Sequence, residues 1–430
     1  MKFDVAVIGL GYVGLPLGLQ FAKSGCRVLG LDIDTAKIKE IEAGRSYIRH
    51  IASENVAAQV QSGQFSVSSD FSLIEKAEAV VICVPTPLNK NREPDISYIL
   101  KTGGAIAAYL KAEEGNRSKL VVLESTTYPG TTDQDLRKVL EKGSGLTAGR
   151  DFHLAFSPER EDPGNPQSKV AEIPKVVGGL TPACLERAKE LYGKAIKKLV
   201  PVSSTRAAEA TKLMENIFRS VNIALVNELK IIYGSMGIDI WEVIEAAKTK
   251  PFGFMPFYPG PGLGGHCIPI DPFYLTWKAR EFGHPTRFIE LAGEINTAMP
   301  EHVIQKVAEA LNSVGKPILG SKILLLGLAY KADVDDDRES PSYILIEKLE
   351  ARGATVLYHD PYIPEIRMTR EHKSLAGRKS VPWDQSCDLI LVSTAHSCFR
   401  EKDFSICKVP VVDTRNLIPP TRRPGAYFQA

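Results

Sequence analysis

The stretch Phe3-Asp-Val-Ala-Val-Ile8, with Gly9-Leu-Gly11-Tyr-Val-Gly14 directly after it, decides the fold of the first part of this chain. The apolar run predicts a buried parallel strand, and a helical pattern follows over residues 15–24. A second strand is expected over residues 27–31, with Asp32 at its end. The glycines allow a tight turn and a close approach to a pyrophosphate, and a terminal carboxylate can bind a ribose. The pattern indicates a dinucleotide-binding β-α-β unit, and NAD rather than NADP because a carboxylate disfavours a 2′-phosphate. A tight turn in an α/β domain that binds no nucleotide is the alternative.

Three further strands are expected over residues 79–84, 120–124 and 153–156, and each leads into a polar loop that contains proline. Thr86, Thr126 and Glu159 lie in these loops. Ligands of open parallel sheets bind beyond the carboxyl ends of the strands. We therefore expect the three loops to line one cleft.

The middle of the chain is predicted to be helical. A long amphipathic helix is expected over residues 205–234, where apolar residues recur at helical spacing, and a second over 286–314 with a kink at Pro300. The segment 251–271 between them is rich in Pro, Gly and aromatic residues and is expected to be a rigid loop. The apolar positions of the first helix are Leu213, Ile217, Val221, Leu225 and Leu229.

A second α/β unit is predicted from residue 321 onward. Strands are expected over 321–327, 355–359, 389–393 and 409–412, with a helix over 340–352. The fold class is therefore α/β, with two doubly wound Rossmann-like domains joined by a long central helix and a helical middle region. The predicted domains are an NAD-binding domain over 1–200, a central helical domain over 201–315 and a nucleotide-binding domain over 316–430.

Composition excludes several classes of protein. Lys and Arg number 53 and Asp and Glu 51, a formal charge of +2 that argues against a nucleic-acid binder or a polybasic membrane anchor. No apolar run approaches the ~20 residues that cross a bilayer, and Asp4 interrupts what could be read as a leader after Lys2. Seven cysteines without a CxxC pair indicate no disulfide framework and no metal cluster. A reducing, cytoplasmic location is expected.

Cys267 is the candidate nucleophile, because it lies in a glycine-rich loop where a ligand could approach the sulfur. Asp271 follows four residues later. His266 is expected to pack rather than act as a base. The alternative for Cys267 is a small buried apolar residue. The other six cysteines are expected to be structural.

Two further groups of polar residues suit an anionic ligand. Lys212 and Asn216 share one face of the long helix, with Arg219 beyond them, and could stabilise a developing oxyanion. A solvated helix face is the alternative. Lys331 and Arg338 lie in a loop that follows Gly327 and suit a phosphate-bearing ligand. The acidic residues 333–337 of that loop have no calcium-binding spacing, so no metal is expected.

Five motifs in this order resemble the UDP-glucose/UDP-mannuronic acid dehydrogenase family over nearly the whole chain. The GGHCIPIDP form is similar to the branch that oxidises UDP-N-acetylhexosamines, and residues 248–254 resemble UDP-N-acetylglucosamine 6-dehydrogenases of surface-polysaccharide and capsule or O-antigen pathways. The motifs are GLGYVGLP from Gly9, SPER at 157–160, EATKLMEN at 209–216, GGHCIPIDP at 264–272 and GLAYKADVDDDRESP at 327–341.

The resemblance implies a four-electron oxidation of a sugar C6 alcohol with two NAD+, through a thiohemiacetal and a thioester on Cys267. The implied catalytic residues are Cys267, Lys212, Asn216, Asp271, Thr126 and Glu159. The implied NAD contacts are Gly9, Gly11, Tyr12, Val13, Gly14, Asp32, Lys37, Thr86, Thr126 and Arg338. The implied contacts to the UDP-sugar substrate are Arg160, Lys212, Asn216, Arg219, Gly264, Tyr330, Lys331 and Arg415.

One segment departs from the family pattern. Many relatives carry a His-Pro-Arg segment that reaches a neighbouring subunit, but this chain has Thr249-Lys250-Pro251, so Lys248 or Lys250 is the expected substitute. The family also implies a homo-oligomer, a dimer or larger, built on the long helix, although that helix could equally be buried within one chain. UDP-glucose, UDP-N-acetylmannosamine and UDP-N-acetylgalactosamine remain alternative substrates. A two-electron dehydrogenase and a catalytically silent nucleotide-sugar-binding protein remain alternative functions.

Overall fold

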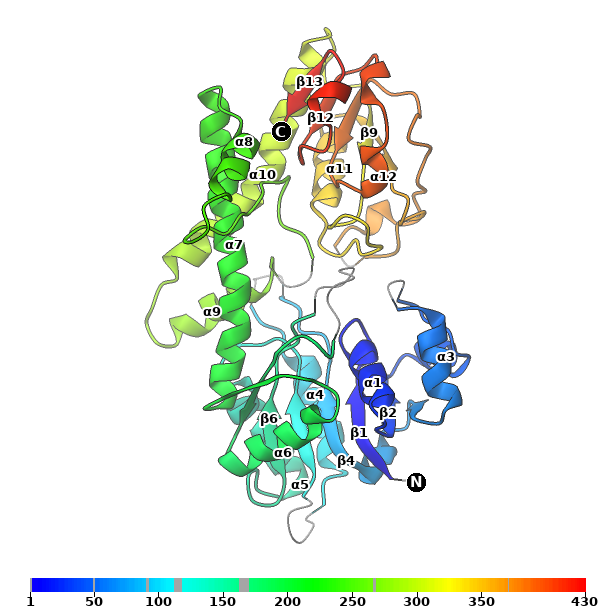
Figure 1. Cartoon of the computed structure of the whole chain (residues 1–430), viewed down its shortest axis with the longest axis vertical. Coiled ribbons are helices and arrows are strands. Elements are labelled where there is room, and N and C mark those ends of the chain that lie inside the picture. Colours follow the sequence, from blue (N-terminus) through cyan, green and yellow to red (C-terminus); the bar gives the residue numbers. More distant parts are fainter. Residues whose placement is uncertain are drawn as a thin grey trace. The chain divides into compact units, whose positions relative to one another are not determined.

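The computed structural model describes residues 2–48, 51–89, 93–111, 118–161, 170–265, 268–369 and 371–430. The chain divides into two compact units (Figure 1). The first comprises residues 1–215 and 273–284, and the second comprises residues 216–272 and 285–430. The long helix α7 (Thr205–Ser235) contributes residues to both units.

The first unit is built on an eight-stranded sheet in the order β3-β2-β1-β4-β5-β6-β7-β8. Neighbouring strands are parallel except for β6 and β7, which are antiparallel. Its first six strands have the order of a dinucleotide-binding fold. The strands are β1 (Phe3–Ile8), β2 (Val28–Leu31), β3 (Phe65–Ser68), β4 (Ala77–Ile82), β5 (Leu120–Leu123), β6 (His153–Phe156), β7 (Lys175–Gly179) and β8 (Leu199–Val202).

Two apolar clusters pack on the two faces of this sheet, because alternate residues of each strand point to opposite sides. Val5 and Val7 of β1 belong to one cluster, and Ala6 and Ile8 belong to the other. Both faces are therefore covered. The helices of this unit are α1 (Gly14–Lys23), α2 (Thr35–Glu42), α3 (Ser53–Gln61), α4 (Ser97–Ala107), α5 (Arg137–Ser144), α6 (Pro182–Gly193), the 3₁₀-helix η1 (Phe71–Lys76) and the π-helix η2 (Thr131–Leu136).

The middle of the chain is helical, as predicted. Besides α7, it contains α8 (Ile240–Ala247), α9 (Asp271–Arg280) and α10 (Arg287–Asn312), and Pro300 lies inside α10. The predicted apolar stripe of α7 is buried only in part, since Leu213 is 1% exposed whereas Leu225 is 49% exposed. Among the described residues, no helix has the length and apolar character needed to span a bilayer.

The second unit contains a parallel five-stranded sheet in the order β10-β9-β11-β12-β13, drawn from yellow to red in Figure 1. This is the flavodoxin-like order, and its switch point lies between β9 and β11. The strands are β9 (Lys322–Leu326), β10 (Thr355–His359), β11 (Leu389–Val392), β12 (Val411–Asp413) and β13 (Tyr427–Gln429). The helices are α11 (Pro341–Ala351), α12 (Ser397–Arg400) and the 3₁₀-helices η3 (Lys373–Leu375), η4 (Phe404–Ile406) and η5 (Pro420–Arg422).

The doubly wound fold class is therefore confirmed in both sheets. At the start of α11, the Ser340 side chain accepts the N–H of Ser342, and Pro341 occupies the first turn, where its missing N–H breaks no helical hydrogen bond.

Candidate active site

The glycine loop after β1 leaves room for a ligand at one position and none at the two others. A Cβ on Gly9, which has a φ of 90°, would lie 2.4 Å from the Cys83 oxygen, and one on Gly14 would lie 1.9 Å from the Gly9 oxygen. A Cβ on Gly11 would meet no described atom within 4 Å. Val13, which has no polar side-chain group, is the N-cap of α1. The open space beside Gly11 and the amides of this helix terminus fit a pyrophosphate.

Asp32 lies at the end of β2 and holds the glycine loop. Its carboxylate accepts the N–H of Leu10 at 2.8 Å and the N–H of Asp34 at 2.9 Å. The Lys37 ammonium lies 3.3 Å from Oδ2 of Asp32. Tyr12 and Val13 are partly exposed beside this carboxylate loop. These residues fit the ribose and pyrophosphate of NAD, with Asp32 as the acceptor for ribose hydroxyls.

The three polar loops follow neighbouring strands of the first sheet, as expected. Thr86 follows β4, Thr126 follows β5 and Glu159 follows β6. The Thr86 backbone oxygen accepts a hydrogen bond from the Tyr274 hydroxyl at 2.6 Å. Thr126 and Glu159 are half-buried.

Lys212 is buried, and its ammonium points to the loop after β6. Its Nζ donates to the Glu159 backbone oxygen at 2.6 Å and lies 3.4 Å from the Glu159 carboxylate. The alternative of a solvated helix face is therefore wrong for Lys212, which is 5% exposed. A buried ammonium next to a carboxylate has the chemistry needed to stabilise an oxyanion or to exchange a proton.

A second carboxylate, Glu161, lies in the same loop. Burial and the negative charge of Glu159 raise the pKa of Glu161 to about 8, although Lys175 opposes the shift. Beneath this loop, Lys175 forms an ion pair with Glu124, and the Tyr192 hydroxyl donates to Glu124 at 2.6 Å. The site therefore holds a carboxyl group that stays protonated at pH 7.

Arg160 forms an ion pair with a carboxylate of α7. Its guanidinium lies 2.6 Å from the Glu215 carboxylate and donates to the Pro174 backbone oxygen at 2.6 Å. If Arg160 contacts the substrate as predicted, its guanidinium has to bind the substrate and Glu215 together.

Glu209 ties the start of α7 to the loop that follows β5. Its carboxylate accepts the Gly130 N–H at 2.7 Å, the Thr132 N–H at 2.9 Å and the Thr132 hydroxyl at 2.7 Å. Burial nevertheless raises the pKa of Glu209 to about 7, while these hydrogen bonds lower it. Glu209 thus fixes the Thr126 loop on the helix that carries Lys212.

Asn216 and Asp271 form a buried pair in the second unit. The Asn216 amide donates to the Asp271 carboxylate at 2.5 Å, and the two residues are 1% and 2% exposed. Arg219 in turn donates to the Asn216 side-chain oxygen. Asn216 lies one helical turn after Lys212 on α7, as the sequence predicted.

The glycine-rich loop before α9 packs on the loop that follows β9. A Cβ on Gly264 would lie 2.7 Å from Cβ of Tyr330, and the Gly265 N–H donates to the Arg338 backbone oxygen at 3.2 Å. The Arg338 guanidinium donates to both carboxylate oxygens of Asp336, at 2.8 and 2.6 Å. Gly264 therefore packs against Tyr330, and Lys331 follows Tyr330 in the sequence.

Arg415 follows β12 and lies against Gly260, where a Cβ would be 2.3 Å from its Nη1. Its Nε donates to the Ser393 backbone oxygen at 3.1 Å. Burial lowers the pKa of Arg415 to about 10, which leaves it charged at neutral pH. Arg415 lines a cavity of about 790 Å³ together with Trp241 and Tyr258. A charged arginine beside aromatic rings suits a nucleotide.

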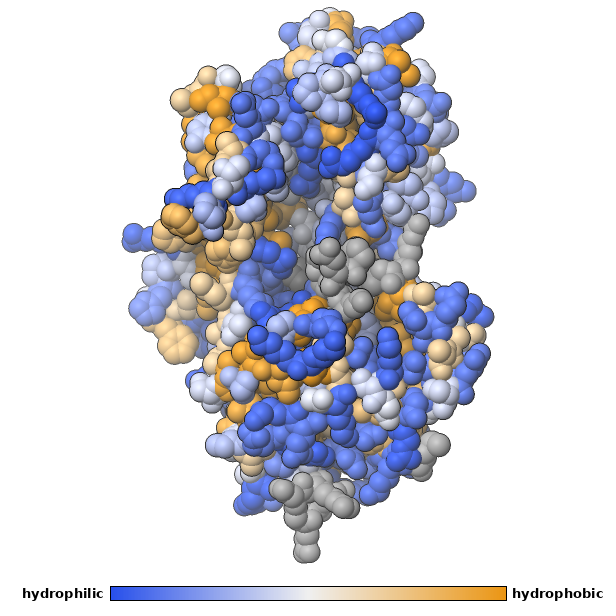
Figure 2. All heavy atoms as spheres, viewed as in Figure 1, coloured by the Kyte–Doolittle hydropathy of each residue, from blue (hydrophilic) through white to orange (hydrophobic). Residues whose placement is uncertain are grey.

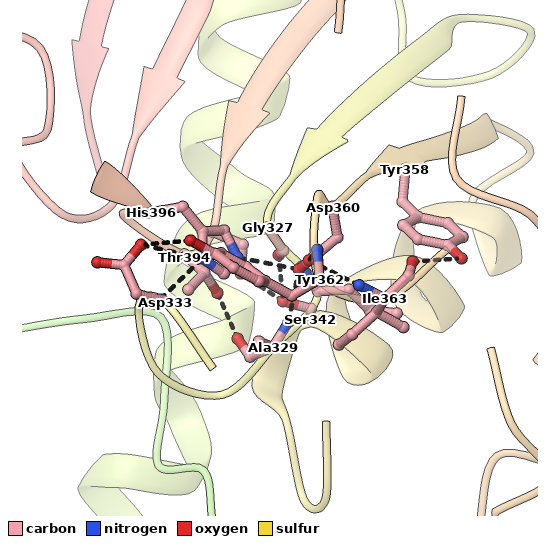
Figure 3. A network of polar contacts seen from close by, with 12 residues as sticks. Gly327, Ala329, Asp333, Ser342, Tyr358, Asp360, Tyr362, Ile363, Thr394 and His396 are labelled. Atoms are coloured by element: carbon pink, nitrogen blue, oxygen red, sulfur yellow. Dashed lines mark hydrogen bonds and ion pairs between the residues drawn. The ribbon is translucent and has the colours of Figure 1, made fainter. Parts of the chain in front are cut away.

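The second sheet has its own carboxylate, Asp360, at the end of β10, the place that Asp32 occupies at the end of β2 (Figure 3). Asp360 accepts five hydrogen bonds: from the N–H groups of Leu328, Ala329, Tyr362 and Ile363, at 2.6, 3.0, 2.8 and 3.1 Å, and from Nε2 of His396 at 3.0 Å. A carboxylate offers about four lone-pair sites. Asp360 is therefore saturated by the protein.

The acidic loop 333–337 is held by protein donors. Asp333 accepts the Ser397 N–H at 2.8 Å, Asp336 binds Arg338, and Asp337 accepts the Tyr343 hydroxyl. The described residues contain no group of three or more His, Cys, Asp or Glu side chains placed to hold a metal ion. The Asp333 N–H also donates to Nδ1 of His396, as Figure 3 shows.

His266 and Cys267 lie outside the described residues, so their predicted roles stay predictions. The remaining cysteines are free thiols, and Cys26, Cys83 and Cys184 are buried. The expected substitutes for the His-Pro-Arg segment are both engaged locally, since Lys248 pairs with Glu245 and Lys250 lies 5.1 Å from the ring centre of Phe252.

Sequence reasoning missed Glu209, Glu161 and Glu215, although each adjoins a residue that it selected. Glu209 and Glu215 lie three residues before and after Lys212, and Glu161 follows Arg160. That spacing places the two helical carboxylates one turn from Lys212. This spacing in the sequence could have indicated Glu209 and Glu215 as neighbours of Lys212.

Comparison with known proteins matches three family models in chain order. They describe the NAD-binding domain of the UDP-glucose/GDP-mannose dehydrogenase family over residues 3–196, its central domain over 206–298 and its UDP-binding domain over 324–420.

Individual relatives match along nearly the full length. A UDP-N-acetyl-D-glucosamine 6-dehydrogenase of Pseudomonas aeruginosa is 36% identical over 397 residues, which is 92% of this chain and 91% of the relative. A UDP-N-acetyl-D-mannosamine dehydrogenase of Pyrococcus horikoshii is 36% identical over 96% of both chains. The solved structure of the Pyrococcus horikoshii UDP-D-ManNAc dehydrogenase covers 100% of this chain and 99% of its own, with a TM-score of 0.88 and 31% identity.

Proposed function

The chain belongs to the UDP-glucose/GDP-mannose dehydrogenase family, and on that basis we propose that it oxidises the C6 alcohol of UDP-N-acetyl-D-glucosamine to the carboxylate. The coarser activity, an NAD-dependent UDP-sugar dehydrogenase, follows from the family and its NAD-binding domain. The choice of N-acetylglucosamine is supported by the Pseudomonas aeruginosa relative and by the resemblance of residues 248–254. Relatives named for N-acetylmannosamine keep that sugar as the second candidate. A role in the biosynthesis of a surface polysaccharide follows from the same resemblance.

The observation that carries the proposed mechanism is the pair of polar contacts on α7. Lys212 contacts Glu159 in the first unit, and one turn later Asn216 contacts Asp271 in the second unit. The buried lysine and the buried amide lie one turn apart on α7, and each contacts an acidic residue of another segment. We therefore assign Lys212 and Asn216 to stabilisation of the oxyanion, and Lys212 to proton transfer.

NAD bound in this domain would supply the hydride acceptor for each of the two oxidations. Gly11, Asp32 and Lys37 would hold it, with Thr86 and Thr126 at the neighbouring strand ends. Arg338 is proposed as a further NAD contact, for which it would have to release Asp336.

Cys267 is proposed to add as a thiolate to the aldehyde, forming a C–S bond while Lys212 or Asn216 stabilises the oxygen. Loss of the second hydride converts the thiohemiacetal to a thioester. Water, positioned by Thr126, Glu159 and Asp271, then cleaves the C–S bond and releases the sugar carboxylate and the thiol. Glu161, protonated at pH 7, is proposed to protonate the leaving Cys267 thiolate and to regain a proton from the attacking water, whose second proton goes to solvent.

The nucleotide sugar is proposed to bind the surface made by Gly264, Tyr330 and Lys331, with Arg415 on the phosphates or base. Arg160 and Arg219 are the two other proposed contacts to the nucleotide sugar. Arg160 is held by Glu215 of α7, and Arg219 is held by Asn216 of the same helix. The domain bounds 1–200, 201–315 and 316–430 remain a proposal, which the three matched ranges support.

The decisive experiment measures NADH formed per sugar across a panel of four UDP-sugars: UDP-N-acetylglucosamine, UDP-N-acetylmannosamine, UDP-N-acetylgalactosamine and UDP-glucose. A ratio near two and the highest kcat/KM with UDP-N-acetylglucosamine are expected. A ratio of one would refute the four-electron route, and a better second sugar would reassign the substrate. Cys267→Ser is expected to abolish acid formation and leave NAD binding intact.

A homodimer is the proposed assembly. Phe218, Leu225 and Ile232 are spaced by seven residues on α7 and are 43%, 49% and 46% exposed. Such spacing presents one apolar stripe, which a second α-helix can cover. Apolar side chains also gather at the upper left of Figure 2, over the ends of α7 and α8. A second copy of this chain would bury the stripe against its own.

A further inference from the structure

A cavity of about 530 Å³ lies in the second unit, bordered by the end of α7, the start of α8, α10 and β13. Its polar lining includes Lys230, Ser235, Asp239, His302, Gln305 and Gln429. None of the residues proposed to contact NAD or the UDP-sugar lines it. Its volume lies in the range of small-molecule sites.

Lys230 lies deep in this cavity and needs an acceptor. It is 7% exposed, and within the described part of the chain its Nζ has no hydrogen-bond partner. A buried ammonium without a partner is costly, because neither water nor a counter-charge compensates its desolvation. Burial accordingly lowers the pKa of Lys230 to about 7. An anionic oxygen inside the cavity would satisfy this donor.

The other charges of the cavity limit the charge of its ligand. Lys306 is neutralised by Glu309, with 2.7 Å between Nζ and Oε2. The Asp239 carboxylate borders the same cavity and accepts the N–H of Trp241 at 2.9 Å. Lys230 is therefore the cation of this lining whose ammonium has no hydrogen-bond partner among the described residues, and the carboxylates of Asp239 and Glu309 favour a singly charged ligand over a doubly charged phosphate.

The uncharged groups of the cavity suit hydroxyl groups. Burial, followed by the charges of Lys230 and Lys306, lowers the pKa of His302 to about 4, so its imidazole is neutral at pH 7. Gln305 and Gln429 contribute amides. The Ser235 hydroxyl donates to the Ile231 backbone oxygen at 3.0 Å, which leaves its own oxygen able to accept.

We propose that this cavity binds a small monocarboxylate that carries hydroxyl groups, with its carboxylate on Nζ of Lys230 and its hydroxyls on the amide and hydroxyl groups of the lining. A single water could satisfy Lys230, but it would occupy about 30 Å³ of a cavity of about 530 Å³. The cavity adjoins the one lined by Arg415, with Asp239 in both linings, but none of the proposed catalytic residues lines it.

The test uses the full-length protein with D-glucuronate as the probe and D-glucose as its uncharged counterpart. Thermal shift and calorimetry are measured on the wild type and on two variants. Lys230→Met keeps the aliphatic stem and removes the charge, whereas Lys306→Met removes a lysine of the same lining whose charge Glu309 already neutralises. Glucuronate, but not glucose, should raise the melting temperature of the wild type and of Lys306→Met. In Lys230→Met, its affinity should fall at least tenfold.

The pH dependence gives an independent readout. The groups that act on Lys230 are Asp413 and Asp239, which favour its charged form, and Arg415 and Lys306, which oppose it. Because the carboxylate needs the ammonium form, glucuronate should bind on the order of thirtyfold more weakly at pH 8.5 than at pH 6, given the pKa of about 7.

Three results would overturn the proposal: no response of the wild type to glucuronate, an equal response in Lys230→Met, or a larger response to inorganic phosphate at equal ionic strength. Lys230→Met should form NADH at the wild-type rate without glucuronate. A protein that does not bind glucuronate could thus still be the proposed dehydrogenase. Likewise, a protein without dehydrogenase activity could still bind glucuronate in this cavity.

Discussion

The Lys212 ammonium lies 2.6 Å from the backbone oxygen of Glu159, so the buried lysine of α7 is bonded to the loop after β6. This contact positions the cation by a neutral acceptor, with the Glu159 carboxylate 3.4 Å away. To turn toward an oxyanion, the lysine has to give up one short bond to a neutral acceptor and one longer contact to a carboxylate.

Replacing Lys212 with Ala should lower kcat about 10²- to 10⁴-fold, because the developing oxyanion loses its donor and proton carrier. Steady-state NADH formation gives kcat, and calorimetry should show NAD affinity within twofold of the wild type. The matched control is Lys198→Ala, since Lys198 is exposed directly before β8. Lys212→Ala with a kcat within threefold of the wild type would exclude the assigned role.

Asp32→Asn should weaken NAD binding about tenfold or more, because a charged acceptor of ribose hydroxyls is lost while one amide oxygen can still hold the Leu10 N–H. Asp360→Asn is the matched control in the second sheet. It should lower the melting temperature, since five donors lose their carboxylate, and leave NAD affinity unchanged. Equal loss of NAD affinity in both variants would argue against Asp32 as the ribose acceptor.

Glu209 should make stability fall as pH rises. Its pKa is raised from 4.5 to about 7, so between these values the folded protein binds more protons than the unfolded chain. The wild type should therefore lose about 3 kcal/mol relative to Glu209→Gln between pH 4.5 and pH 7. Urea unfolding of both proteins across this range measures the difference. A difference that does not change with pH would show that Glu209 stays ionised on its three donors.

Ile232→Asp should produce a monomer if α7 pairs with a second copy, because a charge inside an apolar helix contact is desolvated without a partner. Light scattering after size exclusion gives the mass. Glu228→Asp, at an exposed position one turn earlier on α7, should leave the mass unchanged. A wild type that is already monomeric would remove the proposed assembly.

Strands with continuous apolar sequences could be predicted closely. β1 and β6 match the predicted ranges 3–8 and 153–156, and α7 differs from its predicted end by one residue. The missed strands lack that signal. β3 alternates serine with apolar residues, β7 ends in two glycines, and β8 contains Pro201. Their pairing depends on neighbours distant in sequence, which local propensity does not contain.

The site was predictable where residue type and position sufficed, as with the glycine loop and Asp32. The hydrogen bonds and ion pairs between the site residues could not be predicted, because they depend on which side chains the fold buries. The spacing of Glu209 from Lys212 marks it as a neighbour on the helix, but the sequence does not show that Glu209 is fully buried whereas Glu228 of the same helix is exposed. Lys230 was overlooked for the same reason, since its lack of a partner is a property of the packed structure alone.

The saturation of Asp360 has a kinetic consequence. A dinucleotide that approached the second sheet would find every lone pair of that carboxylate in use, and ribose hydroxyls would have to displace His396 or backbone donors from a buried site. We therefore expect that excess NAD does not inhibit the enzyme by occupying the second sheet. The chain thus contains two doubly wound sheets, and only the first has a carboxylate at the end of its second strand that is free to accept ribose hydroxyls.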